Sequence, residues 1–260
     1  MSTLTATLAA PLTIAVGCAS KIGPRQQNDD AATYSVQHDF FAVADGIGGA
    51  PHGDVASACA VNAAIQARET GATLLEAFRA ANDAVIQLCT WIASPETGTT
   101  LLLGEHREPE DDGTAGTMSF VWAGDTAAFL LHDGAVSCIT PPDRLEGTNA
   151  LRTAVGYTPD IPVQHASCSF ERGDRLLLAT DGVWETLDAE RLATLLSSSD
   201  NAPWLAESIT REAAEHGHDN ATAIVLIAGA STALDDAPVI EPPADVPPSP
   251  HTPTCPQTCY

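Results

Sequence analysis

Three aspartates in this sequence stand at the ends of apolar segments, where a carboxylate serving only solubility is not expected. Asp45 follows the aromatic and β-branched run 40–44 and precedes four glycines within eight residues. Asp181 follows a predicted strand, 174–180, whose centre is apolar, and Asp219 precedes the apolar run 222–228. Glycines after a strand let the backbone approach an ion or a phosphate closely. Carboxylates gathered at such strand ends repel one another unless cations lie between them.

The residue types limit which cation could lie there. Oxygen ligands without an accompanying Cys or His set favour a hard ion, Mg²⁺ or Mn²⁺, over Zn²⁺. Two such ions about 4 Å apart could hold a hydroxide and displace a phosphate ester in line. An ordinary strand, turn and helix with a solvated Asp45 is the simpler alternative. A dinucleotide-binding loop fits less well, because Pro51 stands where its third glycine is needed.

Several elements are expected to position these carboxylates. Residues 33–36 and 40–44 are expected to pair as antiparallel strands, and a helix is expected from Val55 to residue 69. A second helix is predicted by apolar residues at steps of four and three. These residues are Leu74, Phe78, Ala81, Val85, Leu88 and Ile92.

The middle of the chain is expected to be rich in strands. Residues 99–103 form one predicted strand, and 105–112, with five acids in eight residues, is predicted to be a solvated loop. Strands at 117–123, 126–132 and 135–140 are expected to form a meander with turns at 124–125 and 133–134.

The last part of the folded region alternates strands with helices. A strand is expected at 163–170, and another from Asp174 leads to Asp181. Asp188 and Pro203 suit the first turns of two helices that run to 196 and 214, before a final strand at 222–228.

Composition excludes several classes of protein. The chain has 260 residues and 44% hydrophobic content, with 34 acids against 11 bases and a net charge of −23. Such a negative field makes nucleic acid an improbable partner, and no apolar run reaches the length of a membrane span. Seven cysteines, an odd number scattered mostly through apolar segments, indicate reduced thiols. We therefore expect a cytoplasmic protein, monomeric and without a membrane anchor.

The C-terminal region differs in composition from the rest. From Leu234 the sequence consists mainly of Pro, Asp, Thr and Ser, which cannot bury enough apolar surface to fold. We therefore predict a folded domain at 1–232 and a disordered proline-rich tail at 233–260. Cys255 and Cys259 lie in this tail, where a metal site would need two more ligands.

Seven motifs in this order resemble those of the metal-dependent Ser/Thr protein phosphatases of type 2C. The resemblance runs to about residue 228, and each motif alone is weak, whereas their order is specific. The motifs are R-Q-Q-N-D-D at 25–30, D-G-I-G-G at 45–49 with G-D-V-A-S at 53–57, G-T-T at 98–100, A-G-D-T at 123–126, N-A-L-R-T-A-V-G at 149–156, A-T-D-G-V-W-E at 179–185 and D-N-A-T at 219–222.

The resemblance implies a fold and a mechanism. The fold would be α+β, a four-layer α-β-β-α sandwich of two antiparallel sheets flanked by helices. The cofactors would be two or three Mn²⁺ or Mg²⁺ ions, and a hydroxide held by two metals would attack phosphorus directly. The substrates would be proteins phosphorylated on serine or threonine, so that the enzyme opposes a Ser/Thr kinase.

The resemblance also implies roles for individual residues. Asp45 would bridge both metals and Arg25 would bind the phosphate, which makes these two the predicted catalytic residues. The remaining predicted metal ligands are Asp29 through water, the Gly46 carbonyl, Asp125 at a third ion, Asp181 and Asp219. Asp30 could support the metal ligands or merely form part of a turn.

The sequence departs from the family pattern at two places. Ala127 stands where an Arg is common, and Ile47 stands where some relatives have a His proposed as the acid for the leaving group. His52 could replace that acid or be a bystander, and His216 and His218 fit a polar loop. A catalytically inactive relative used as a regulatory binding module is the main alternative. A phosphatase of a partner-switching or secretion-system regulator would share the chemistry and differ in substrate.

Overall fold

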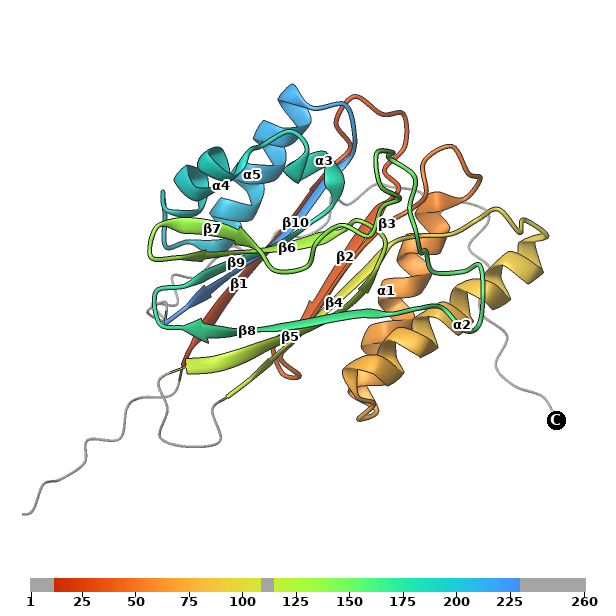
Figure 1. Cartoon of the computed structure of the whole chain (residues 1–260), viewed down its shortest axis with the longest axis horizontal. Coiled ribbons are helices and arrows are strands. Elements are labelled where there is room, and N and C mark those ends of the chain that lie inside the picture. The colour runs from red at the N-terminus through yellow and green to blue at the C-terminus, as the bar shows by residue number, and fades with distance from the viewer. Residues whose placement is uncertain (1–11, 109–114, 230–260) are drawn as a thin grey trace, which may run out of the picture.

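The fold is a sandwich of two five-stranded antiparallel sheets with helices on both outer faces (Figure 1), seen in a computed structural model that describes residues 12–108 and 115–229. This arrangement confirms the predicted α+β four-layer fold. The predicted tail at 233–260, with its two cysteines, lies outside the described residues.

Each sheet draws strands from distant parts of the chain. The first sheet contains, in spatial order, β1 (Ile14–Lys21), β10 (Ala221–Ala228), β9 (Arg175–Ala179), β6 (Ala127–His132) and β7 (Ala135–Cys138). The second contains β2 (Asp30–Ser35), β3 (Phe40–Asp45), β4 (Leu101–Arg107), β5 (Ala115–Ala123) and β8 (Gln164–Glu171). The predicted pairing of the strands before Asp45 is confirmed, since β2 and β3 are antiparallel neighbours.

Helices cover the outer face of each sheet. The second sheet packs against α1 (Gly53–Glu69) and α2 (Leu74–Ile92), and the first against α3 (Asp181–Trp184), α4 (Ala189–Leu196) and α5 (Ala202–His216). The apolar stripe predicted for α2 is buried against the sheet at Phe78, Ala81 and Val85. Asp188 caps α4 as predicted, because its side chain accepts a hydrogen bond from the Arg191 amide.

The meander predicted for 117–140 is wrong at its first turn. β5 pairs with β4 and β8, whereas β6 pairs with β7 and β9, so the chain crosses from one sheet to the other at Gly124 and Asp125. A Gly-Asp pair signals a change of direction but does not say which strands then pair. The crossover lets Phe120 and Ala128 pack in the same apolar layer between the two sheets. It also removes Asp125 from a hairpin tip and buries it.

The acidic loop predicted for 105–112 begins later than expected. β4 continues to Arg107, and Glu105 and His106 are buried in it. Glu105 is tolerated there because Arg68 and Arg107 both form ion pairs with its carboxylate. The prediction was wrong for Glu105 because it counted charges without their partners, and a charged side chain can be buried when it is paired.

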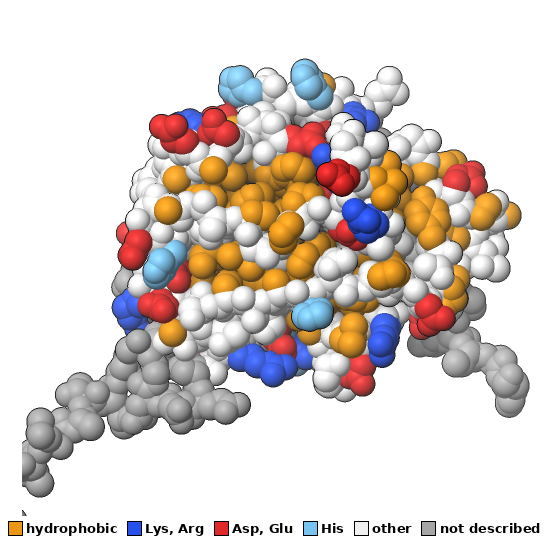
Figure 2. Space-filling view, in the orientation of Figure 1, with side chains coloured by type: hydrophobic (Ala, Val, Ile, Leu, Met, Phe, Trp, Pro, Cys, Tyr) orange, Lys and Arg blue, Asp and Glu red, His pale blue; other side chains and the backbone are white. Residues whose placement is uncertain are grey.

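The edge of the sandwich formed by β7 and β8 faces the viewer in Figures 1 and 2. β7 and β8 each end a sheet, and Figure 2 shows hydrophobic side chains exposed across the middle of this face. In the described part of the chain, every helix is too short or too polar to cross a bilayer.

Candidate active site

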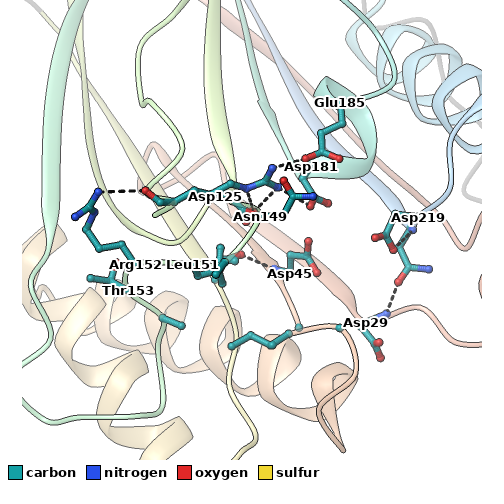
Figure 3. A pocket seen from close by; sticks show the side chains of 18 of the residues that line it. Asp29, Asp45, Asp125, Asn149, Leu151, Arg152, Thr153, Asp181, Glu185 and Asp219 are labelled. Atoms are coloured by element: carbon teal, nitrogen blue, oxygen red, sulfur yellow. Dashed lines mark hydrogen bonds and ion pairs between the residues drawn. The ribbon is translucent and has the colours of Figure 1, made fainter. Parts of the chain in front are cut away.

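The predicted site residues converge on one cavity. β3 ends at Asp45, β9 leads into α3 at Asp181, and Asp219 lies just before β10. Figure 3 shows Asp45, Asp181 and Asp219 around a common space, with Asp29 and Asp125 beside them. The cavity has a volume of about 610 Å³. Its lining includes all seven predicted residues, Arg25, Asp29, Asp45, Gly46, Asp125, Asp181 and Asp219.

Threonines hold the backbone of Asp45 in place. The Thr100 Oγ1 accepts a hydrogen bond from the Asp45 amide at 2.9 Å, and the Thr99 hydroxyl donates to the Asp45 carbonyl at 2.9 Å. Thr100 Oγ1 lies 2.6 Å from Thr126 Oγ1, which follows the crossover between the sheets. The G-T-T motif thus fixes the end of β3 from the neighbouring strand.

Position 46 has no room for a side chain, so that only glycine fits there. A Cβ at this position would overlap the backbone of Gly53, at the start of α1. The Gly46 amide donates to the Asp29 carbonyl at 3.0 Å, which brings the two predicted ligands together. Glycine therefore allows the close approach of backbones that the sequence pattern indicated.

Asn220 ties the first loop to the start of β10. Its amide group donates to the carbonyls of Ile22 and Gln27 at 2.8 and 2.9 Å, and its Oδ1 accepts from the Asp29 amide at 2.9 Å. Asn220 is buried, so these bonds are shielded from water. The side chain therefore keeps Arg25 and Asp29 next to Asp219, although about 190 residues separate them in the sequence.

The carboxylates of Asp45, Asp125 and Asp181 form a group that could bind a metal ion, with oxygens within 4.8 Å of one another. Burial, followed by repulsion from Asp30, Asp181 and other acids, raises the pKa of Asp45 well above its usual range. Burial and the neighbouring carboxylates raise the pKa of Asp181 to about 6.

One oxygen of this group lacks a partner among the described residues. Asp181 Oδ1 is buried there without a hydrogen bond. A buried oxygen without a donor, in a group of acids that repel one another, fits a hard divalent cation. The residues present therefore suit the Mg²⁺ or Mn²⁺ that the sequence predicts.

Asp30 lies at the start of β2, beside the group, and is partly buried. It pairs with Asp45 across β2 and β3, and its Oδ2 accepts a hydrogen bond from the Thr180 hydroxyl at 2.9 Å. Burial, with smaller effects of Asp181 and Asp219, raises its pKa to about 7. Of the two alternatives for Asp30, support of the metal-binding group fits better than a turn, because Asp30 belongs to β2 and lies opposite Asp45.

Arg25 stands at the rim of the cavity. Its Nη2 lies 2.6 Å from Asp219 Oδ2, and its Nε donates to the His218 carbonyl at 3.1 Å. Both side chains of the ion pair are partly exposed, at 47% and 36%. The guanidinium is therefore accessible to a phosphate that enters the cavity.

Sequence reasoning missed Arg144, which reaches into the acidic group from the segment between β7 and β8. Its Nη2 lies 2.6 Å from Asp125 Oδ2 and 3.0 Å from Asp181 Oδ2, and its Nη1 binds Glu185. The guanidinium also stacks on the Trp184 ring, 4.9 Å from the centroid. The available signal was weak: one of only 11 basic residues stands in an irregular stretch after two prolines.

The histidine candidates lie elsewhere. His52 precedes α1 with φ of 60°, and the His216 ring is bonded to the Glu212 carbonyl. No histidine is among the described residues that line the cavity, whereas Ile47 is. This geometry favours the bystander interpretation of His52.

Comparisons of the sequence and of the fold with known proteins point to the same family. The family model described as protein phosphatase 2C matches residues 19–225. No curated protein matches the sequence.

Solved structures of bacterial phosphatases share the fold. PppA of Pseudomonas aeruginosa, described as a key regulatory component of T6SS, is 25% identical with a TM-score of 0.72, over 84% of this chain and 100% of that one. The PPM Ser-Thr phosphatase MsPP of Mycobacterium smegmatis, solved with cacodylate, is 26% identical with a TM-score of 0.72, over 82% and 97%. The serine/threonine phosphatase PstP/Ppp of Mycobacterium tuberculosis is 24% identical with a TM-score of 0.70, over 84% and 99%. The chain therefore belongs to the protein phosphatase 2C family, as a member of the bacterial metal-dependent (PPM) Ser/Thr phosphatases.

Proposed function

We propose that this protein is an active metal-dependent phosphatase that hydrolyses phosphoserine and phosphothreonine on proteins and so opposes a Ser/Thr kinase. The main support is the convergence of Asp45, Asp181 and Asp219 on one cavity beside the accessible guanidinium of Arg25. A relative that served only as a binding module would not need to retain all three carboxylates together with this arginine.

The divalent ions would be held by the predicted ligands. Asp45 would contact both ions, Asp181, Asp219 and the Gly46 carbonyl would complete the set, and Asp29 would act through water. When bound, such ions supply Lewis-acid charge to the phosphoryl group and lower the pKa of the attacking water. The chain itself therefore needs no nucleophilic Ser or Cys.

The chain's own contribution is to bind and orient the phosphate. Arg25 offers a planar fork of donors that matches two phosphate oxygens. In the structure this fork is held by Asp219 and the His218 carbonyl, which aims it at the cavity before substrate arrives. The phosphate of the substrate would share or replace the contact between Arg25 and Asp219. Arg25 should therefore contribute mainly to substrate binding.

A phosphopeptide assay tests this proposal. The metal-stripped protein is given a phosphothreonine peptide, then Mn²⁺, then excess chelator, and phosphate release is measured. We expect turnover with Mn²⁺, loss of turnover with chelator, and loss in Asp45→Ala and Asp219→Ala. Asp83→Ala, at an exposed position on α2, is the matched control and should keep full activity. Activity that survives the chelator or the Asp45 change would overturn the mechanism.

A wild-type protein without turnover on any phosphopeptide would favour the inactive binding module instead. To separate that result from a misfolded sample, Mn²⁺ binding is measured on the same preparation. Bound Mn²⁺ with no turnover would support the binding module.

The likeness to PppA favours a second candidate, a phosphatase that regulates a secretion system. The chemistry would be the same and only the substrate would differ. Phosphoproteomics after deletion of the gene distinguishes the two candidates. If the protein regulates a secretion system, phosphothreonine should accumulate on components of that system. If it opposes another Ser/Thr kinase, phosphothreonine should accumulate on the targets of that kinase.

The predicted compartment is part of the same proposal. The five cysteines in the described part of the chain are all free thiols, which agrees with a reducing cytoplasm. A monomer is expected, and size-exclusion chromatography with light scattering checks it.

A further inference from the structure

Arg144 places a permanent positive charge inside the group of carboxylates that could bind metal. Only 16% of its side chain is exposed, and its contacts with Asp125 and Asp181 lie within the cavity. A guanidinium is not deprotonated in proteins, so this charge persists at every working pH. A metal ion that approached the same oxygens would be repelled by it.

The two carboxylates are not engaged equally. Asp125 Oδ2 accepts a hydrogen bond from Arg144 Nε at 2.7 Å and lies 2.6 Å from Nη2 as an ion pair. Asp181 gives only its Oδ2 to Arg144, at 3.0 Å, and its Oδ1 has no partner among the described residues. Asp181 therefore keeps a buried oxygen for a metal ion while it contacts Arg144, whereas Asp125 makes the shorter and more numerous contacts with Arg144.

The backbone that presents Arg144 is held firmly. Asp143 is buried, its amide donates to the Gly124 carbonyl at 2.9 Å, and its carboxylate accepts from Thr153 Oγ1 at 2.5 Å. Arg152 Nε also pairs with the Asp143 carboxylate at 3.2 Å. Because Gly124 directly precedes Asp125, the same contacts fix Arg144 and its main partner together.

Further contacts hold the guanidinium at its other end. Nη1 binds the Glu185 carboxylate, and the plane lies over the Trp184 ring. A cation–π contact of this kind attracts the guanidinium to the face of the ring and strengthens when water is excluded. Displacing Arg144 would break these contacts in addition to the bonds to Asp125 and Asp181.

We propose that Arg144 is a built-in cation that removes Asp125 from metal binding, so that the protein holds two divalent ions and not three. A third ion, bound through Asp125, would enter only when Arg144 is replaced by a neutral residue. The inference rests on the proposed function for the pair of ions at Asp45, Asp181 and Asp219. It adds that the number of ions is set by an arginine.

The test counts bound Mn²⁺ on the full chain, by isothermal titration calorimetry and by electron paramagnetic resonance of free Mn²⁺. We expect two ions for the wild type, three for Arg144→Gln, two for Asp125→Asn, and two for the double variant. Arg191→Gln is the control for net charge, because Arg191 pairs with Glu212 on the outer helices. It should bind as many ions as the wild type.

The results distinguish this inference from the proposed function. A wild type that binds three ions, or that loses one ion on Asp125→Asn, overturns the inference and leaves the phosphatase intact. An unchanged count in folded Arg144→Gln also overturns it. A wild type that binds no Mn²⁺ overturns the proposed function and the inference together. If circular dichroism shows that Arg144→Gln does not fold, Asp125→Asn alone decides: an unchanged count supports the inference and a loss contradicts it.

Discussion

Replacing Asp45 with asparagine should stabilise the metal-free protein while weakening its binding of Mn²⁺. Asp45 is partly buried and lies among other carboxylates, and both effects raise its pKa well above the usual range. Without metal, the folded protein must therefore either bury a charge among like charges or hold a proton that the unfolded chain releases. Asparagine removes this penalty but offers a poorer ligand to a divalent ion.

The magnitude follows from the neighbouring group. The pKa of Asp181 rises from 3.8 to about 6, and each unit corresponds to about 1.4 kcal/mol, so ionisation of Asp181 itself costs on the order of 3 kcal/mol. Asparagine still buries a polar group, which offsets part of the gain. We expect a net stabilisation of about 1–2 kcal/mol, or about 2–8 °C in Tm for a domain of this size.

The effect should depend on pH with a definite sign. A carboxyl group whose pKa is higher in the folded chain than in the unfolded chain binds its proton more tightly when folded. The stability it contributes is complete below the unfolded value of 3.8 and is lost as pH rises through the folded value, about 6 for Asp181. The advantage of Asp45→Asn should therefore be small at pH 5 and larger at pH 7.5.

Thermal unfolding measures this prediction directly. Tm is recorded in chelator and in saturating Mn²⁺ for the wild type, Asp45→Asn and the exposed control Asp83→Asn. In chelator the Asp45 variant should be the most stable, and in Mn²⁺ the order should reverse, because an ion at 100 times its Kd adds about 2.7 kcal/mol to the wild type. A variant that melts below the wild type in chelator at pH 7.5 would refute the reasoning.

Three other substitutions test the binding of phosphate, the close packing of two backbones and an ion pair outside the cavity. Arg25→Ala should raise KM for a phosphopeptide about tenfold with a smaller change in kcat, since a charge-assisted bond to the phosphate is lost; an unchanged KM in steady-state kinetics would exclude that contact. Gly182→Ala should lower Tm by about 4–8 °C in a thermal melt, because a Cβ there overlaps the Asn220 carbonyl oxygen, and a wild-type Tm would show that the backbones can separate. Arg68→Met should cost about 1–3 kcal/mol in urea unfolding, because buried Glu105 loses its buried partner and keeps only the exposed Arg107. Arg68 does not line the cavity, so a folded variant that no longer binds Mn²⁺ would contradict this purely structural role.

The sequence was sufficient where chemistry depends on residue type and order. The strand before Asp45, the glycines after it and the G-T-T motif all lie where the pattern indicated, because each meets a local requirement of backbone geometry. The buried run 40–44 that leads to Asp45 and the narrow gap at Gly46 follow from the same pattern. The predicted ligands line one cavity for this reason, although their metal-binding roles stay predictions.

The sequence was insufficient where the outcome depends on partners distant along the chain. Nothing near Asp125 indicates that the strands on either side of it belong to different sheets. Glu105 looked like part of a solvated loop, because its partner Arg68 lies 37 positions away. Arg144 was missed for the same reason, since its three carboxylate partners come from the crossover, from α3 and from the residue that ends α3.

The most direct test of the account is the anomalous scattering of Mn²⁺ in crystals of the wild-type protein. The account predicts two manganese peaks in the cavity, both within ligand distance of Asp45, with Asp181 and Asp219 among the ligands and Arg25 at the rim. Crystals soaked in Mn²⁺ that show no peak beside Asp45 would contradict it.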